Sequence, residues 1–323
     1  MSLTIWCNGA FDAAAMGRLR EGTAGHRLLL ASGAPASLLA AGASDPALAE
    51  ADVAFGQPSA ADCLRFSGLR WVHVSTAGYT RYDTPEFKEA FRARGSALTT
   101  TSAVFADPVA QHLLAAILAG NRQLFASYRD QLGDHSWPTS ERRYAARLLT
   151  GQTVVMLGFG AIGRRLAELL APFGCTLYAL RRQTRSVLGV RIVAEDNLTQ
   201  VLPLADHVVN ILPENDATRN WMNARRFGCL RSSARFYNAG RGTTVDQRAL
   251  QEALESGRLA AAFLDVTDPE PLPPSHPLWT TPNCYVTPHS AGGRWDQDKA
   301  VVGHFLANLN AFAQGGELAD RVI

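Results

Sequence analysis

Short apolar runs alternate with amphipathic segments along the chain, and this alternation is typical of a parallel α/β fold. The clearest run, residues 153–157, reads Thr-Val-Val-Met-Leu and lacks the polar alternation of a half-exposed strand, so it predicts a buried parallel strand. A glycine-rich turn follows at residues 158–163. Residues 164–171 then carry leucines at helical spacing, which predicts a helix directly after the turn.

The same reasoning predicts strands and helices over the rest of the chain. The predicted strands are residues 3–7, 26–31, 51–56, 71–75, 97–101, 153–157, 176–180, 207–212, 234–238, 260–266 and 284–287. The predicted helices are residues 10–19, 36–41, 62–66, 85–94, 107–128, 140–149, 164–171, 198–202, 223–229, 246–256 and 293–314. The predicted helix at residues 107–128 is one of the two longest. Its only proline, Pro108, lies in the first turn, where a helix tolerates proline.

Composition narrows the classes of protein to consider. A chain of 323 residues is long enough for two domains. The net charge of +2 favours neither nucleic acid nor a membrane surface as a partner. Five widely spaced cysteines without CxxC spacing predict neither a metal site nor a disulfide framework, but free thiols in a reducing compartment. The N-terminus lacks a signal-peptide pattern and no run approaches membrane-spanning length, so we expect a cytoplasmic protein.

The turn at residues 158–163 predicts a binding site for a dinucleotide. Gly158 allows the tight turn, Gly160 lets the backbone approach phosphates without a Cβ in the way, and Gly163 lets the helix pack close to the strand. The N-terminus of the following helix offers free N–H groups and a partial positive charge to a pyrophosphate. A glycine turn of purely structural origin is the alternative, and the strand and helix on either side favour the dinucleotide.

The end of the second strand of this unit indicates which dinucleotide is bound. An acidic residue about 20 positions on binds the ribose hydroxyl of NAD, but here the strand ends in Arg181 and Arg182, with Thr184 close by. Arginines pair well with the 2′-phosphate of NADP through charge-assisted hydrogen bonds, each of about 1.5–3 kcal/mol. A solvated cluster of surface charges is the alternative. The position favours NADP, with NAD still possible.

Polar residues gather in three loops that follow predicted strands, where ligands bind in open parallel sheets. His289 follows Thr287-Pro288, and a neighbouring carboxylate such as Glu270 would favour its charged form and orient it. Arg241, between two glycines, has the forked donors that bind a carboxylate. Taken singly, each residue fits an ion pair, a helix cap or a surface charge. Together they suit hydride transfer to a 2-oxo acid.

From Leu148 to His289 the chain resembles the D-isomer-specific 2-hydroxyacid dehydrogenase family, in particular its glyoxylate/hydroxypyruvate reductases. The matching segments are Gly151–Val154, Gly158–Gly163, Asn238–Gly242, Asp265–Val266, Glu270–Pro273 and Thr287–His289, and their order and spacing match too. Residues 104–105 and 109–112 resemble the family's connecting helix, although that helix typically has Glu where this chain has Gln111. Before residue 70 the similarity is weak.

The resemblance implies an architecture and a site. The fold would be two doubly wound parallel-sheet domains, a Rossmann domain at residues 102–287 and a flavodoxin-like substrate domain at residues 1–101 and 288–323. Arg241, Glu270 and His289 would be the catalytic set, with no metal. Substrate would bind to Arg241, His289 and the backbone of Ala77 and Gly78. The implied cofactor contacts are Gly158, Phe159, Gly160, Ala161, Ile162, Gly163, Arg181, Arg182, Thr184, Leu212, Pro213, Thr218, Ala239, Gly240, Arg241, Asp265 and His289.

These observations predict an NADP-dependent oxidoreductase that reduces a small 2-oxo acid, such as glyoxylate or hydroxypyruvate, to the D-2-hydroxy acid. One alternative is a dinucleotide-sensing binding protein, since some relatives of this family act as transcriptional corepressors. Another is the same chemistry on formate or phosphite. The family forms dimers through its nucleotide domain, so we expect a homodimer. Trp137 fits packing at a domain or subunit surface.

Overall fold

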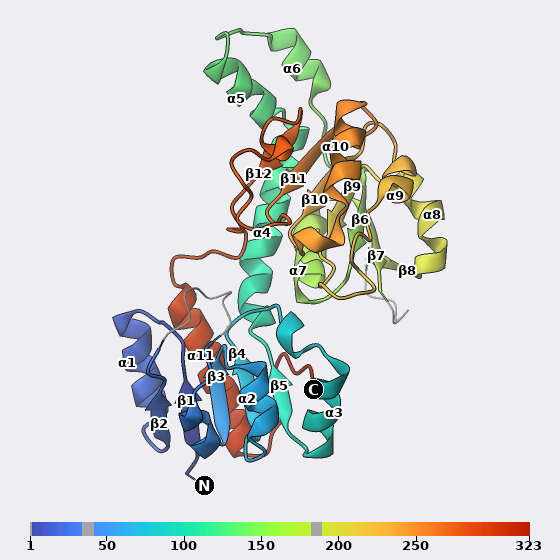
Figure 1. Ribbon diagram of the computed structural model, residues 1–323. Coiled ribbons are helices and arrows are strands. Elements are labelled where there is room, and N and C mark those ends of the chain that lie inside the picture. The colour runs from blue at the N-terminus through green and yellow to red at the C-terminus, as the bar shows by residue number, and fades with distance from the viewer. Residues whose placement is uncertain (1, 34–41, 182–188) are drawn as a thin grey trace. The chain divides into compact units, whose positions relative to one another are not determined.

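The computed structural model describes residues 2–33, 42–181 and 189–323, and the chain divides into two compact units. The first unit is Met1–Phe105 together with Arg294–Ile323, and the second is Ala106–Gly293 (Figure 1). The predicted boundaries, after residues 101 and 287, fall a few residues earlier in the chain. The predicted helix at residues 36–41 and the predicted cofactor contacts Arg182 and Thr184 lie outside the described residues.

The first unit contains a five-stranded sheet in which all neighbouring strands are parallel. Its strands are β1 (Thr4–Cys7), β2 (Arg27–Leu30), β3 (Val53–Gly56), β4 (Trp71–Val74) and β5 (Ala97–Thr99). Their order, β2-β1-β3-β4-β5, is that of flavodoxin-like folds. Every residue of β3 and β4 is buried, which explains why these segments are apolar except at His73, whose ring contacts the hydroxyl of Thr99.

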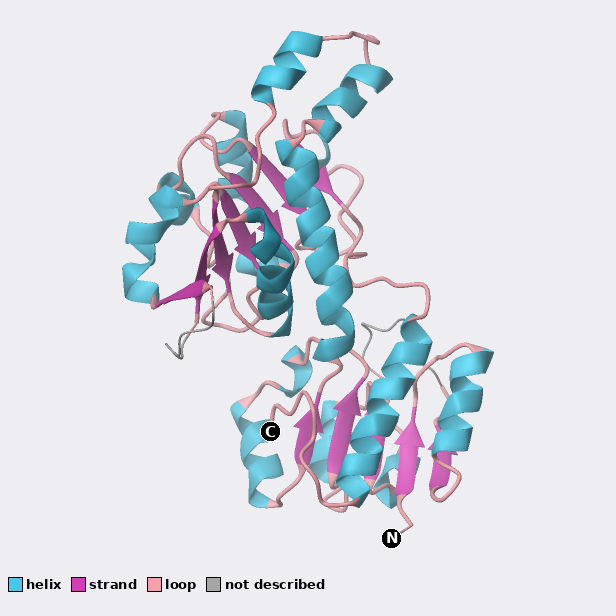
Figure 2. Cartoon of the chain, turned by 180° about the vertical axis from the view of Figure 1, so that it is seen from behind, coloured by secondary structure: helices cyan, strands magenta, loops and turns pink. Residues whose placement is uncertain are grey.

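Helices cover both faces of this sheet (Figure 2). Core residues of α1 (Ala13–Gly22) and α11 (Gln297–Ala313) pack on one face, and those of α2 (Ala60–Arg65) and α3 (Pro85–Ala93) on the other. Phe305 of α11 stacks on Phe55 of β3, with ring centroids 4.1 Å apart. The predicted helix at residues 293–314 starts late, at Gln297, and two short turns at residues 291–292 and 295–296 precede it.

The last residues of the chain complete the first unit. Val322 donates its backbone N–H to the carbonyl of Leu98 in β5, at 2.8 Å. Asp320 Oδ2 accepts the backbone N–H of Ala103, at the start of α4 (Ser102–Asn121), at 2.7 Å. The Asp320 carboxylate thus takes up one of the free N–H groups of that helix, as an N-cap side chain does.

The second unit contains a seven-stranded sheet, also with parallel neighbours throughout. Its strands are β6 (Thr153–Leu157), β7 (Thr176–Leu180), β8 (Val190–Val193), β9 (His207–Asn210), β10 (Arg235–Asn238), β11 (Ala261–Leu264) and β12 (Cys284–Val286). Their order, β12-β11-β10-β9-β6-β7-β8, is the Rossmann order with one strand added. The prediction of two doubly wound parallel sheets is therefore confirmed.

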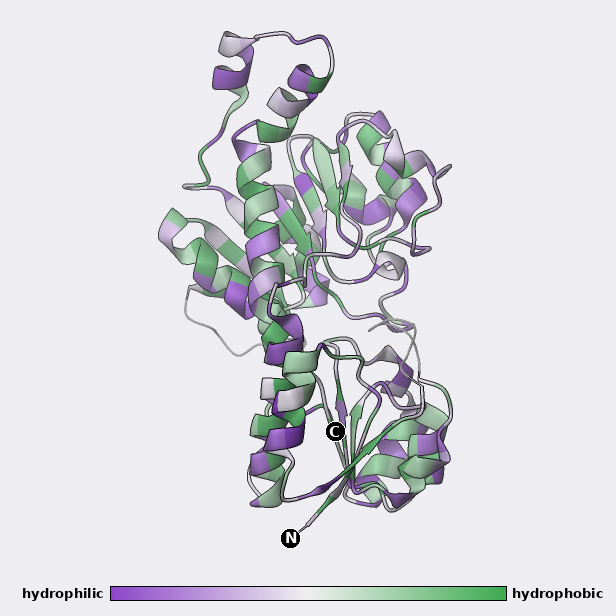
Figure 3. Cartoon of the chain, turned by 90° about the vertical axis from the view of Figure 1, so that its left-hand side faces the viewer, coloured by the Kyte–Doolittle hydropathy of each residue, from purple (hydrophilic) through white to green (hydrophobic). Residues whose placement is uncertain are grey.

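Helices also cover both faces of the second sheet, whose strands are mostly hydrophobic (Figure 3). Core residues of α4 and α7 (Ala161–Leu170) pack on one face, and those of α8 (Leu198–Val201), α9 (Ala224–Gly228) and α10 (Gln247–Glu255) on the other. The short 3-10 helices of the chain are η1 (Pro46–Glu50), η2 (Thr80–Tyr82), η3 (Ala171–Phe173), η4 (Glu195–Asn197), η5 (Leu202–Leu204), η6 (Gly242–Thr244) and η7 (Pro277–Trp279).

The prediction of one helix over residues 107–128 is wrong. Helix α4 begins at Ser102, so Pro108 lies inside it, and it ends at Asn121. Gln123 adopts a left-handed conformation, with φ of 60°, and α5 (Leu124–Leu132) begins after it. By length and composition α4 could cross a membrane, contrary to the prediction that no run approaches that length. Its buried residues, including Leu113 and Ile117, pack into the core of the second unit.

Helices α5 and α6 (Thr139–Ala145) form an extension of the second unit, which we call the α5–α6 arm (residues 124–145; Figure 1). Arg142 holds the two helices together by donating two hydrogen bonds of 2.8 Å to the carboxylate of Asp130. A cavity of about 680 Å³ lies between the helices. Trp137, at the tip, is 91% exposed. The helix predicted at residues 140–149 ends earlier than expected, because α6 stops at Ala145.

Candidate active site

The glycine turn has the geometry that the sequence predicts. Gly158 has φ of +100°, which a residue with a side chain rarely adopts. A Cβ at Gly163 would lie 3.1 Å from the carbonyl oxygen of Gly158 and from Phe159 Cδ2, so the absence of a side chain lets α7 pack against the turn. Phe159 itself is buried in the core. Ala161 and Ile162 begin α7.

The residues at the start of α7 fit a bound pyrophosphate. A Cβ placed on Gly160 meets no heavy atom within 4 Å among the described residues, so this backbone faces open space. Gly160 is the N-cap of α7 and makes no side-chain hydrogen bond to the helix. The first N–H groups of a helix need partners, and here an anion can supply them. The turn is therefore suited to the phosphates of a dinucleotide.

Arg181 directly follows β7, the second strand of the Rossmann order, and its backbone N–H donates to the carbonyl of Val193 at 3.4 Å. The strand β7 has the predicted bounds, Thr176–Leu180. Arg181 therefore lies where the ribose of a bound dinucleotide is recognised in this fold. Arg181 is partly exposed.

Arg241 lies on a loop that a buried polar network holds in place. Asn210, at the end of β9, donates hydrogen bonds to Asn238 Oδ1 at 3.0 Å and to Thr244 Oγ1 at 2.7 Å. Asn238 Nδ2 and Thr244 Oγ1 in turn both donate to the backbone carbonyl of Arg241. Because buried amides and hydroxyls without partners are costly, this network strongly favours one loop conformation.

Two glycines let neighbouring loops approach the Arg241 loop closely. A Cβ on Gly242 would lie 1.9 Å from the carbonyl oxygen of Thr267, and one on Gly240 would lie 2.7 Å from that of Leu212. Leu212 belongs to the loop after β9, which Thr218 closes by donating to the carbonyl of Pro213 at 2.7 Å. The predicted cofactor contacts Leu212, Pro213, Thr218, Ala239 and Gly240 therefore come from adjoining loops at one edge of the sheet.

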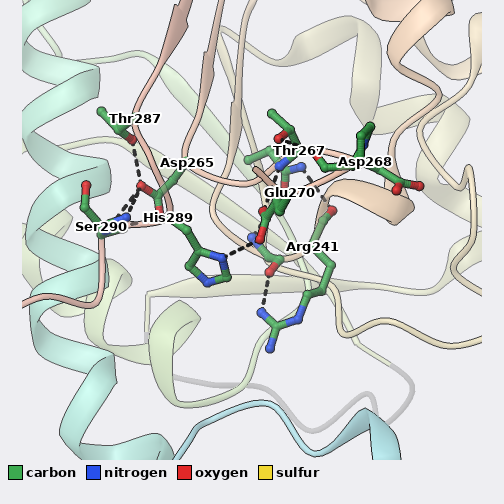
Figure 4. A network of polar contacts seen from close by, with 12 residues as sticks. Arg241, Asp265, Thr267, Asp268, Glu270, Thr287, His289 and Ser290 are labelled. Atoms are coloured by element: carbon green, nitrogen blue, oxygen red, sulfur yellow. Dashed lines mark hydrogen bonds and ion pairs between the residues drawn. The ribbon is translucent and has the colours of Figure 1, made fainter. Parts of the chain in front are cut away.

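The structure brings Glu270 and His289 together. Glu270 Oε2 lies 2.8 Å from His289 Nδ1, and Glu270 Oε1 accepts the backbone N–H of Thr267 at 2.9 Å (Figure 4). Burial alone would raise the pKa of the Glu270 carboxyl. The hydrogen bonds from His289 and Thr267, with the charges of His289 and Arg241, outweigh burial and lower this pKa below its ordinary value. Glu270 is therefore ionised at neutral pH.

Arg241 completes the group. Burial lowers the pKa of its guanidinium, and the nearby carboxylates of Glu214 and Glu270 oppose that shift. A guanidinium stays charged under all ordinary conditions. Nη1 donates to the carbonyl of Gly240 at 2.6 Å, which orients the side chain toward the region of Glu270 and His289 (Figure 4). Glu214 is a neighbour of Arg241 that the sequence analysis did not single out.

Asp265 holds the loop that carries His289. Its carboxylate is 5% exposed and accepts hydrogen bonds from the hydroxyl of Thr287 and from the backbone N–H groups of Ser290 and Ala291, at 2.7–3.1 Å. His289 has φ of 50°, a left-handed conformation that is uncommon for a residue with a side chain. The Asp265 clamp on both sides of His289 supports this backbone. The proposed contact of Asp265 with the cofactor stays a prediction.

Ala77 and Gly78 lie in the first unit, on the loop after β4. Thr76 Oγ1 donates to the carbonyl of Gly78 at 2.7 Å, and Gln57 donates to Thr76 Oγ1 at 3.1 Å. Arg81 donates in turn to Gln57 Oε1. This loop therefore has a defined backbone and is partly exposed at Ala77 and Gly78, as a loop that binds a carboxylate through its N–H groups must be.

The site thus combines three chemical capacities in the second unit. The imidazole of His289 can deliver or accept a proton, Glu270 orients it, and Arg241 can bind a carboxylate or polarise a carbonyl. The described residues contain no cluster of three His, Cys, Asp or Glu side chains that could hold a metal ion.

The sequence analysis missed the supporting residues Asn210, Thr244 and Thr267, because polar residues in loops carry no periodic signal.

Comparison with known proteins identifies a family. The model of the D-isomer specific 2-hydroxyacid dehydrogenase, NAD binding domain, matches residues 114–291. A glyoxylate/hydroxypyruvate reductase B of Escherichia fergusonii is 33% identical over 251 residues, which cover 76% of this chain and 76% of the relative. An uncharacterized protein of Corynebacterium melassecola is 38% identical over 224 residues, which cover 68% of this chain and 72% of the relative.

A solved structure agrees with this result. The D-isomer specific 2-hydroxyacid dehydrogenase of Xanthobacter autotrophicus Py2, in complex with NADPH and MES, superposes with a TM-score of 0.83 at 26% identity. The match covers 100% of this chain and 98% of that one. Similarity to this family, weak before residue 70 by inspection of the sequence, therefore extends over the whole fold.

Proposed function

Because the chain belongs to the D-isomer specific 2-hydroxyacid dehydrogenase family of NAD(P)-dependent oxidoreductases, we propose that it uses NADPH to reduce a small 2-oxo acid to the D-2-hydroxy acid. The observation that carries the proposal is the 2.8 Å pair between Glu270 and His289, with Arg241 beside it. Glyoxylate and hydroxypyruvate are the substrates we favour, because they are the ones named for the relative from Escherichia fergusonii.

Each of the three side chains has a part in the mechanism. The bound nicotinamide dinucleotide supplies the hydride. His289, as the imidazolium, protonates the oxygen of the carbonyl that is being reduced, and Glu270 orients the ring through its contact with Nδ1. Arg241 binds the substrate carboxylate through its forked N–H groups and stabilises negative charge on the carbonyl oxygen. The backbone N–H groups of Ala77 and Gly78 are proposed as further carboxylate ligands.

The preference for NADP is supported by Arg181. A carboxylate at the end of β7 would hydrogen-bond the ribose of NAD and repel a 2′-phosphate, whereas Arg181 attracts that phosphate. The relative from Xanthobacter autotrophicus was solved with NADPH. We therefore propose NADPH as the preferred cofactor and NADH as a poorer one.

The test is a spectrophotometric assay of NADPH and NADH oxidation with glyoxylate, hydroxypyruvate, pyruvate and longer 2-oxo acids. We expect turnover with glyoxylate and hydroxypyruvate. We also expect a higher kcat/KM with NADPH than with NADH. NADPH binding without turnover of any 2-oxo acid would contradict the proposal and favour a dinucleotide-sensing protein. Reduction of NADP⁺ by formate or phosphite would instead support the alternative substrates.

The α5–α6 arm supports a proposal that the protein is a homodimer. Six large apolar side chains along the arm and beside it are exposed: Leu124, Tyr128, Leu132, Trp137, Tyr144 and Leu148. A concentration of exposed apolar side chains on one extension favours another protein surface as their partner. We propose that a second copy of the chain covers them. Light scattering should give twice the mass of 34.8 kDa, and Leu132→Glu with Tyr144→Glu should reduce it to that of one chain. A monomeric wild type would refute the proposal.

A reducing compartment, most simply the cytoplasm, is proposed from the cysteines. All five are free, and burial raises the pKa of the Cys284 thiol to about 12, which makes it unreactive. Fractionation of cells that produce the protein would test this localisation, and recovery in a secreted fraction would contradict it.

A further inference from the structure

Gln247 bridges the loop that carries Arg241 and the loop that carries Glu270. It is the first residue of α10, six positions after Arg241. Its Nε2 donates to the backbone carbonyl of Asp268, and the backbone N–H of Asp268 donates to its Oε1 at 3.2 Å. One side-chain amide therefore satisfies both backbone groups of one residue, as a neighbouring strand would.

Asp268 lies in the turn that shapes the Glu270 carboxylate. Thr267, the residue before it, donates its backbone N–H to Glu270 Oε1 at 2.9 Å, and Thr267 Oγ1 donates to the carbonyl of Pro269 at 3.0 Å. Glu270 is thus folded back onto its own loop through Oε1, which leaves Oε2 for His289. A shift of Asp268 would carry Thr267 with it and move the carboxylate.

The other end of the bridge is rigid. Asp246 caps α10 by accepting the backbone N–H of Ala249 at 3.0 Å, and the N–H of Asp246 donates to the carbonyl of Met222 at 2.9 Å. Gly242, on the same loop, lies so close to the carbonyl of Thr267 that a Cβ there would overlap it. Contact at Gly242 sets the closest approach of the two loops, and Gln247 prevents them from separating.

We infer that Gln247 is a positioning residue, which holds the Glu270 loop at the distance from the Arg241 loop at which Glu270 reaches His289. The inference rests on the proposed function, because it concerns the same site. The bridge needs both the Nε2 donor and the Oε1 acceptor of Gln247. A glutamate at this position keeps an acceptor for the N–H of Asp268 but has no donor for the carbonyl of Asp268, and a methionine has neither group.

The test compares Gln247→Met and Gln247→Glu with Gln251→Met. Gln251 is the same residue type on the next turn of α10, and its Nε2 donates to Glu255 instead of to a loop. We expect Gln247→Met to lower kcat for the 2-oxo acid about tenfold, with KM for NADPH within about twofold of the wild type. Gln247→Glu should lower kcat by a smaller factor, and Gln251→Met should have the kcat of the wild type.

Two further measurements separate positioning from stability. The acid limb of the pH–kcat profile should move to higher pH in Gln247→Met, because Glu270 loses part of the hydrogen bonding that keeps it ionised, and should not move in Gln251→Met. Backbone hydrogen exchange in residues 265–271 should quicken in Gln247→Met alone. Equal kcat, pH profile and exchange in the two methionine variants would overturn the inference. Should the wild type reduce no 2-oxo acid, the proposed function fails, and hydrogen exchange still decides whether Gln247 holds the loop.

Discussion

His289 Nδ1 lies 2.8 Å from Glu270 Oε2, and the two residues stand on loops that follow neighbouring parallel strands, β12 and β11. Because Nδ1 faces the carboxylate, Nε2 is the ring nitrogen that can deliver a proton to a substrate. The carboxyl ends of parallel strands meet at one edge of a sheet, so two residues 19 positions apart in the chain become a proton-transfer pair.

Replacing His289 should abolish catalysis without abolishing cofactor binding. We expect His289→Ala to lower kcat about 10²–10⁴-fold, the range that general acid catalysis contributes. NADPH should still bind, because the glycine turn and Arg181 are unchanged. Stopped-flow kinetics and NADPH fluorescence measure the two quantities. Turnover equal to that of the wild type would remove His289 from the mechanism.

Glu270→Gln keeps the shape of the side chain and removes its charge. Because the folded-state pKa of Glu270 is lowered, its ionised form stabilises the protein above the ordinary pKa of about 4.5, and this stabilisation is lost as pH falls through the lowered pKa. The free energy of unfolding of the wild type should exceed that of the variant most above pH 5. Urea titrations at several pH values measure the difference, and a gap that does not depend on pH would contradict the assignment.

Arg241→Lys tests whether the forked guanidinium is needed. Lysine keeps the charge but cannot bind a carboxylate through two parallel hydrogen bonds. Loss of one charge-assisted hydrogen bond, about 1.5–3 kcal/mol, corresponds to a fall of roughly 10- to 150-fold in kcat/KM for the 2-oxo acid. Steady-state kinetics measure this, with thermal unfolding as the control for folding. An unchanged kcat/KM would show that charge alone suffices.

Arg181→Asp should reverse the cofactor preference. The aspartate would repel the 2′-phosphate of NADPH and accept a hydrogen bond from the ribose of NADH. We expect kcat/KM to fall for NADPH and to rise for NADH, and their ratio measures the change. Arg181→Ala is the matched control, which should lower kcat/KM for NADPH without raising kcat/KM for NADH. If both variants keep the wild-type ratio, the 2′-phosphate is recognised elsewhere.

His207 should make the second unit sensitive to acid. It is fully buried between Tyr237 and Gln152, and burial, with the charge of Arg235, lowers its pKa from 6.5 to about 3. A lowered pKa contributes stability above pH 6.5 that is lost as pH falls toward 3, at about 1.4 kcal/mol per pH unit. Comparison of His207→Gln with the wild type by urea unfolding between pH 7 and 4 isolates this slope. Parallel curves would contradict it.

The sequence predicted the buried strands well because their apolar runs are nearly continuous. The prediction for β6 has the bounds found in the structure, and β7 does too. Strand β8 was missed, since its four residues include the charged Arg191 and lie at the edge of the sheet. Helix α4 was misplaced because Pro108 was taken as a start signal, although a proline inside a helix is tolerated where packing along the helix compensates for it.

The reactive side chains of the candidate site could be predicted from the sequence, but the contacts that hold their loops in place could not. Arg241, Glu270 and His289 could be found because each follows a strand and stands in a recognisable motif. The left-handed backbone of His289 and the clamp by Asp265 depend on contacts between loops, which periodicity does not encode. Gln247 likewise looks like any polar residue in the first turn of an amphipathic helix.

The first unit is assembled from both ends of the polypeptide, with the second unit inserted between them. During synthesis on the ribosome, residues 106–293 form a continuous segment and can therefore fold as soon as they emerge. The five-stranded sheet lacks α11 and its partner for β5 until residues 294–323 follow. The dinucleotide-binding half therefore does not depend on residues 294–323, whereas the first unit does. Nascent chains arrested behind a linker that follows residue 293 and spans the ribosomal exit tunnel should bind NADPH immobilised on a resin while the first unit is still sensitive to protease.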